Sequence, residues 1–356
     1  MDISFVPSLE HASCQKIVMS LLSDSDLKWR DADDYHKIKS RVTEKISKLI
    51  PCNLLQRKLE KFIAPLLFEV RKWAMFCEKN WAGLEIRSCR VRDTIPQCRL
   101  RDGTIDREKC MNLLVKNRDI NPLNRFIMAC TFCMFEDVLD LWNSLLRIEK
   151  GYLRNRCSTS SDISYFIIRH WIEWLESSTD KDWESFAAWA LETPVWKSNI
   201  FMLKRVLQTL SPAEKSQRLL KALTGGEVSS DMMRFGLSIM SEDEREVIFR
   251  ESPLEVFKCI LSWPLRNVFI DFASKLWPYV TEDTFCEILY NILRMIKNER
   301  FEYVELLVIL KSFWAQSPNH YKKFAEQDSY LCGPLNYVLE YDFAQQFQRD
   351  GFLRKF

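Results

Sequence analysis

Helix-start signals recur along the second half of this chain and constrain its fold more than any other feature. Ser211-Pro212-Ala213-Glu214 and Ser241-Glu242-Asp243-Glu244 have the Ser-x-x-Glu pattern of a capping box, whose two end residues bond each other's backbone N–H groups. Thr281-Glu282-Asp283-Thr284 occupies the equivalent place without the reciprocal Glu. The three starts are 30 and 40 residues apart, which is the length of a helix pair with its turns.

Helices of about ten to seventeen residues fit between these signals. Isolated helices of that length are marginal in water, so they must be stabilised by their neighbours. An all-β fold is disfavoured because its many turns need glycine, and the chain has only eight glycines. The sequence therefore predicts an all-α protein, built as an irregular α-solenoid of antiparallel helix pairs.

The first half predicts an N-terminal helical hairpin. A helix capped by Ser25 or Asp26 is expected to run towards Ile50, where Pro51 stops it. A second helix is expected from Asn53 to Trp81, and Pro65 is expected to kink or divide it. We predict three domains, listed in chain order: an N-terminal helical region at 1–82, a basic connector at 83–120 and a repeat array at 121–356. A short helix is expected at Asp106–Lys116 and a break at Gly151–Asp162.

One helical phrase occurs three times, at 135–141, 254–260 and 301–307. Each copy begins with an apolar residue and Glu. Any residue comes next, then Val or Phe, and an aliphatic residue closes the seven. The stretch Ala129–Trp142 resembles the end of the first helix and most of the second helix of an ankyrin repeat. Asn121-Pro122-Leu123-Asn124 is similar to the opening of that repeat, three residues further upstream than the pattern requires. Cys133 stands where the family has its turn glycine.

This resemblance covers the segments near 121–142, 254–260 and 301–307. It implies a degenerate ankyrin-like stack of helix pairs, and it implies protein binding as the function. Repeat arrays present extended surfaces to other molecules. We therefore predict a non-catalytic scaffold or adaptor whose partner is another protein, with no cofactor.

Composition narrows the classes of function. Fifty-one basic and 49 acidic residues almost balance. The net charge of the chain therefore gives no reason to expect binding to nucleic acid or to an anionic membrane. The longest apolar run, Phe126–Phe135, is about half the roughly 20 residues of a membrane-spanning helix. No secretory signal is visible, and the twelve scattered cysteines suit a reducing compartment. We expect a cytoplasmic protein and leave a nuclear location open.

Catalytic signatures are sparse. The chain has no Gly-x-Ser-x-Gly, His-Glu-x-x-His or Gly-x-x-x-x-Gly-Lys-Ser/Thr motif and only four histidines, so we predict that it is not an enzyme. Cys130-x-x-Cys133 is one half of a zinc pattern that lacks its second Cys-x-x-Cys. We favour small buried residues at a helix turn over zinc ligands.

The connector offers the best local site for a charged partner. Five arginines lie within fifteen residues: Arg87, Arg90, Arg92, Arg99 and Arg101. Such a cluster can contact phosphates, which keeps open the alternative of a nucleic-acid-associated helical repeat. A solvated loop is the simpler interpretation. Five tryptophans at 171–196 could form a peptide groove, but their helical spacing favours core.

Overall fold

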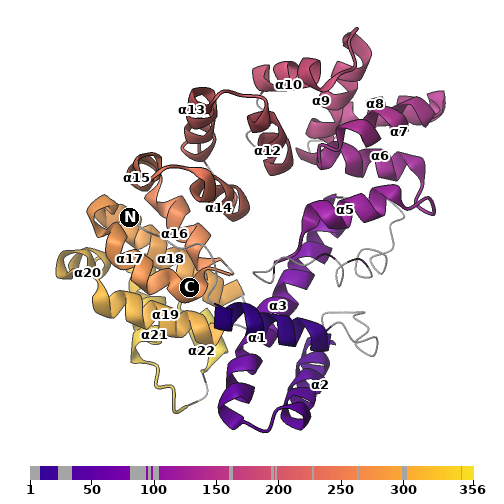
Figure 1. Ribbon diagram of the computed structural model, residues 1–356. Helices are drawn as coiled ribbons and strands as arrows, with labels where there is room; N and C mark the ends of the chain where they lie inside the picture. Colours follow the sequence, from indigo (N-terminus) through magenta and orange to yellow (C-terminus); the bar gives the residue numbers. More distant parts are fainter. Residues whose placement is uncertain are drawn as a thin grey trace. The chain divides into compact units, whose positions relative to one another are not determined.

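A computed structural model describes residues 9–22, 34–80, 94, 98, 104–159, 163–193, 196, 199–226, 228–262, 264–298, 303–345 and 347–356 (Figure 1). Helices account for 81% of these residues, and they contain no strand. The predicted all-α class is therefore confirmed. The described residues form two compact units, 9–215 and Ser216–Phe356, and each is considered by itself. Their boundary lies inside the predicted 121–356 array, and the three predicted domains stay a prediction.

Three long helices pack together near the N-terminus: α1 (Leu9–Leu22), α2 (Asp34–Leu49) and α3 (Asn53–Asn80). Helices α2 and α3 occupy the two stretches predicted to form the hairpin, and α1 packs against both. The predicted cap at Ser25 or Asp26 lies outside the described residues. The predicted division at Pro65 is wrong, because α3 continues through it. Proline removes one helical hydrogen bond. The buried stripe of α3, which includes Leu59, Ile63 and Leu66, packs on both sides of that site and keeps the helix together.

The rest of the first unit is a series of shorter helices. In chain order they are α5 (Arg107–Lys116), α6 (Pro122–Thr131), α7 (Phe135–Ser144), α8 (Arg147–Thr159), α9 (Ile163–Ser177), α10 (Trp183–Glu192) and α12 (Ile200–Gln208). Helix α6 packs against α5, α7 and α9, and α8 packs against α9. The predicted helix at Asp106–Lys116 is present as α5, and Asp106 caps it, because its carboxylate accepts the N–H of Lys109 at 3.0 Å.

Cys133 lies in the turn between α6 and α7, at the place where an ankyrin repeat has its turn glycine. The Cys133 φ of +52° is the only positive φ among the described residues other than glycine. Glycine adopts this left-handed conformation at no steric cost, whereas other residues are strained by it. The turn is held by a hydrogen bond from Met134 N–H to the carbonyl of Ala129 at 2.9 Å. A helix–turn–helix unit is therefore present at 122–144, and the ankyrin resemblance itself stays a prediction.

The predicted break at Gly151–Asp162 is wrong for its described part. Helix α8 runs through Gly151 and continues to Thr159. Glycine costs a helix interior roughly 1 kcal/mol relative to alanine. The buried side chains of Leu153 and Cys157 on the same helix offset this cost.

The second unit contains further short helices. They are α14 (Ser230–Ile239), α15 (Glu242–Glu251), α16 (Pro253–Leu261), η2 (Arg266–Val268), α17 (Phe269–Leu276), η3 (Trp277–Tyr279), α18 (Glu282–Asn298), α19 (Tyr303–Gln316), α20 (Asn319–Ala325), α21 (Ser329–Glu340) and α22 (Arg349–Leu353). Two of them, α15 and α18, begin at the predicted starts Ser241 and Thr281. Helix α13 (Pro212–Leu223) crosses the boundary between the units. The capping boxes at Ser211 and Ser241 both form, and Thr281 accepts the N–H of Thr284 at 3.2 Å.

Helices in this unit pack against their second neighbours in the chain. Helix α14 packs on α16, α16 on α18, and α18 on α20 and α21. A second series runs from α17 to α19 and on to α21. The phrases at 135–141 and 254–260 lie in α7 and α16, and residues 303–307 of the third lie in α19. Phe301 and Glu302 are outside the described residues.

An aromatic cluster forms the core between these helices. Phe313 of α19 lies 6.0 Å from Phe257, 5.4 Å from Phe269 and 5.4 Å from Phe285, measured between ring centroids. All four rings are fully buried. They come from α16, α17, α18 and α19, so one cluster connects both series of stacked helices.

Replacement of Phe257 by alanine tests this core. We expect Phe257→Ala to lower the free energy of unfolding by about 3–5 kcal/mol, because it leaves a cavity among the other rings. Phe343→Ala is the matched control, since that ring is 47% exposed. We expect the control to cost less than about 1 kcal/mol in urea unfolding followed by circular dichroism. Equal costs for both variants would show that α16 is not core.

Candidate functional site

The predicted arginine site cannot be placed on the fold. Arg87, Arg90, Arg92, Arg99 and Arg101 all lie outside the described residues. Their role as partner contacts stays a prediction.

The Cys130-x-x-Cys133 pair lies in the core at the end of α6. Both side chains are fully buried. Burial raises the pKa of the Cys133 thiol to about 12 and raises the pKa of Cys130 as well. Protonated thiols of this kind pack as small apolar groups. In the part of the chain that the structure describes, no group of three His, Cys, Asp or Glu side chains could hold a metal ion.

The tryptophans of 171–196 divide into two groups. Trp171, Trp174 and Trp196 are buried, which confirms the prediction of core for these three. Trp171 stacks on Phe186 with 3.8 Å between ring centroids, and its Nε1 donates to the carbonyl of Cys130 at 3.0 Å. Trp183 and Trp189 are half-buried at the edge of this aromatic group.

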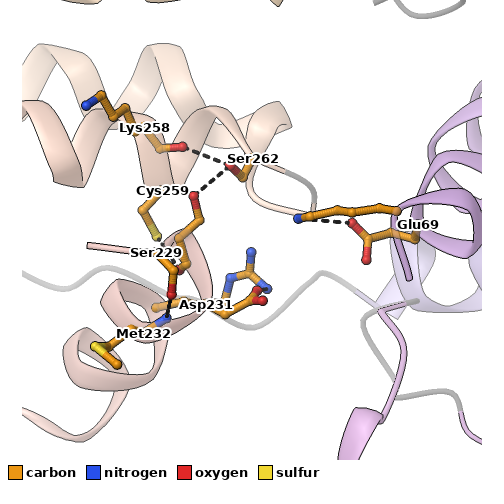
Figure 2. Close-up of polar contacts among 10 residues, drawn as sticks. Glu69, Ser229, Asp231, Met232, Lys258, Cys259 and Ser262 are labelled. Atoms are coloured by element: carbon orange, nitrogen blue, oxygen red, sulfur yellow. Dashed lines mark hydrogen bonds and ion pairs between the residues drawn. The ribbon is translucent and has the colours of Figure 1, made fainter. Parts of the chain in front are cut away.

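A polar cluster joins α14 to α16, and Figure 2 shows its contacts. Ser229 caps α14 by accepting the N–H of Met232 at 3.2 Å. The hydroxyl oxygens of Ser230 and Ser262 are 3.0 Å apart, and Ser262 also donates to the carbonyl of Lys258 at 2.9 Å. We call these residues, together with Cys259, Asp231 and Arg234, the α14–α16 polar cluster.

A buried thiol and an ion pair complete the cluster. The Sγ of Cys259 lies 3.5 Å from the carbonyl oxygen of Ser230, and Asp231 lies 3.8 Å from Arg234. Serine, aspartate, arginine and cysteine are residue types that also build nucleophilic sites. Sequence analysis missed this set because its members are about 30 residues apart. The Ser229 cap and the i, i+3 spacing of Cys259 and Ser262 were the available signals.

The residues of the α14–α16 polar cluster have a structural role. Cys259 is fully buried, and this burial raises the pKa of its thiol to about 12, although Arg234 acts in the opposite direction. A reactive cysteine needs a lowered pKa and access to solvent. Cys259 has neither, so the cluster serves to fix α14 on α16.

Glu69, also drawn in Figure 2, is a buried carboxylate of a different kind. It lies on α3, and its Oε1 is 3.9 Å from the Nζ of Lys72 one turn later. Lys72 is exposed, so this pair contributes little to stability.

The outward face of α19 is the clearest candidate for a binding surface in the second unit. Val304 and Val308 lie one turn apart and are 51% and 48% exposed. Phe343, from the segment after α21, lies 5.2 Å from the Nζ of Lys311 on the same helix. We call Val304, Val308, Lys311 and Phe343 the α19 face.

Both charged residues of α19 are held by internal partners. Glu305 pairs with the buried Arg266 at 3.4 Å, and Arg266 donates from Nε to the carbonyl of Leu261 at 2.9 Å. Lys311 donates to the carbonyl of Tyr341. The remainder of the helix is apolar on almost every side, as is typical of a buried helix. The α19 face therefore exposes aliphatic side chains on a helix of core composition.

None of the described helices is both long and apolar enough to cross a membrane.

Thiol labelling tests the description of the cysteines. All eleven cysteines of the described residues are free, and Cys52 is the exposed one. With iodoacetamide at pH 8 we expect Cys52 to react first, while Cys133 and Cys259 react only after urea unfolding. Their raised pKa keeps both thiols protonated at this pH, and burial excludes the reagent. Peptide mass spectrometry reads the rates, and native labelling of Cys259 as fast as Cys52 would contradict the structure.

Comparison of the chain with protein-family models and with curated proteins gave no match.

Proposed function

We propose that this protein is a non-catalytic scaffold or adaptor that binds another protein through the α19 face. One observation carries the proposal: Val304 and Val308 are exposed on a helix whose charged residues are both engaged internally. Exposed aliphatic and aromatic side chains that lie together are typical of interaction sites. A partner that covers Val304, Val308 and Phe343 would complete the burial that the composition of α19 favours.

The packing of the second unit supports a repeat architecture. Second-neighbour packing, from α14 to α16 to α18 and from α17 to α19 to α21, is what stacked helix pairs produce. We propose that this unit is an irregular α-solenoid with ankyrin-like pairs. Such arrays use one face of the stack to hold partners.

Catalysis has less support than binding. The α14–α16 polar cluster contains nucleophile-type residues, but its thiol is buried and protonated. A nucleophile in that state cannot reach a substrate. The same residues are fully explained by the contacts that hold two helices together.

Replacement of one valine of the α19 face tests the proposed function. We expect Val308→Asp to abolish capture of the protein partner from native lysate, because it places a charge in the apolar contact. Stability should change by less than about 0.5 kcal/mol, since the side chain is at the surface. Affinity capture and mass spectrometry, with and without nuclease, make the measurement.

Val247→Asp is the matched control, because Val247 is an exposed valine on α15. It should retain the partner. Loss of all captured protein on nuclease treatment, with binding that weakens steeply in salt, would instead favour the nucleic-acid alternative through Arg87–Arg101. Equal capture by both valine variants would remove the α19 face from the proposal.

A further inference from the structure

Helix α8 carries a second exposed face, in the unit 9–215. Ile148 is 79% exposed and Tyr152, one turn later, is 52% exposed. Leu146, just before the helix, is also exposed. Arg147 and Arg156 lie on the two sides of this apolar strip and are both exposed. We call these five residues the α8 face.

The opposite side of α8 packs against α9 (Figure 1). Leu153 and Cys157 are buried there. Arg154 forms a charge-assisted contact with Glu176 of α9, at 2.6 Å from Nη2 and 2.7 Å from Nε to Oε1. These contacts determine which side of the helix is turned outward, and they leave the α8 face uncovered by the described residues.

Gly151 forms a notch in this outward side. A side-chain carbon added there would meet no atom within 4 Å. Glycine is unfavourable in an exposed helix interior, and here no contact within the described chain requires it. A glycine between Ile148 and Tyr152 allows the backbone of another helix to approach closely, as small residues do at helix–helix contacts.

The charge around the notch is strongly one-sided. Residues 146–159 contain one acid, Glu149, and four basic side chains, of which Arg154 is paired with Glu176. Glu149 is already engaged, because it accepts the N–H of Leu146 at 2.8 Å. Arg156 lies over the ring of Tyr165 at 5.5 Å, and among the described residues neither Arg156 nor Arg147 pairs with a carboxylate. Two copies of this face would repel each other, so a second copy of the chain is not the occupant.

We infer that the α8 face docks an acidic amphipathic helix of another protein. Its aliphatic side chains would pack on Ile148 and Tyr152, and its backbone would approach Gly151. Arg147 and Arg156 are nine residues apart, which is roughly 13 Å along the helix. The partner would therefore present carboxylates about two and a half turns apart. This inference rests on the proposed protein-binding function and adds a second surface to it.

Two synthetic peptides test the inference with the full chain. One is an 18-residue helix with a leucine stripe flanked by glutamates about two and a half turns apart. The other has lysine in place of every glutamate. By fluorescence anisotropy we expect the acidic peptide to bind at least tenfold more tightly than the basic one. Ile148→Glu should weaken acidic-peptide binding at least tenfold. Ile239→Glu, an exposed isoleucine of α14, is the matched control and should not.

Two further variants separate docking from folding. The double variant Arg147→Glu, Arg156→Glu should no longer bind the acidic peptide and should bind the basic peptide instead. An unfolded variant could not gain this new binding. Lys275→Glu, an exposed control on α17, should change neither. Gly151→Leu should weaken binding of the acidic peptide at least tenfold. It should not lower the melting temperature, because the new side chain fills open space.

Several outcomes would overturn the inference. They are equal affinity for both peptides, no binding of either peptide, or binding of phosphatidylserine vesicles or duplex RNA that depends on Ile148. Val308→Asp should bind the acidic peptide normally. If the peptide tests fail while capture of the partner from lysate still depends on Val308, this inference is refuted and the proposed function is not.

Discussion

The structure depends on short helices that cannot stand alone. Most described helices have fewer than about 15 residues, a length at which an isolated helix is marginal in water. Their stability must come from apolar side chains shared between neighbours. Phe257, Phe269, Phe285 and Phe313 show this directly, because each belongs to a different helix and all four meet in one cluster. The α14–α16 polar cluster adds specific hydrogen bonds to the same packing.

Local signals in the sequence predicted much of this fold. The capping residues Ser211, Ser241 and Thr281 mark true helix starts, since a cap acts within four residues of chain. The prediction that the helix divides at Pro65 was wrong, and so was the predicted break from Gly151 over its described part. At both places the cost of the breaker is a few kcal/mol at most, and the buried stripe of the same helix exceeds it.

The candidate surfaces were harder to predict, because exposure depends on neighbours that are distant in sequence. Val304 lies in the phrase at 301–307 and Val308 directly follows it, and only the packed structure shows that this side of α19 is uncovered. The spacing of the tryptophans in 171–196 favoured core over a peptide groove, and three of them are buried. Spacing alone cannot distinguish a helix that is buried all round from one that awaits a partner.

Binding by exposed faces requires a helix stack that supports itself. Hydrogen exchange of the intact chain, read by mass spectrometry, tests its physical basis most directly. Helices α16 and α18 each have packed neighbours on more than one side, so we predict that their amides exchange last, by global unfolding. Exchange in α16 as fast as in the short terminal helix α22 would contradict the account, because the aromatic cluster would then not be holding the stack together.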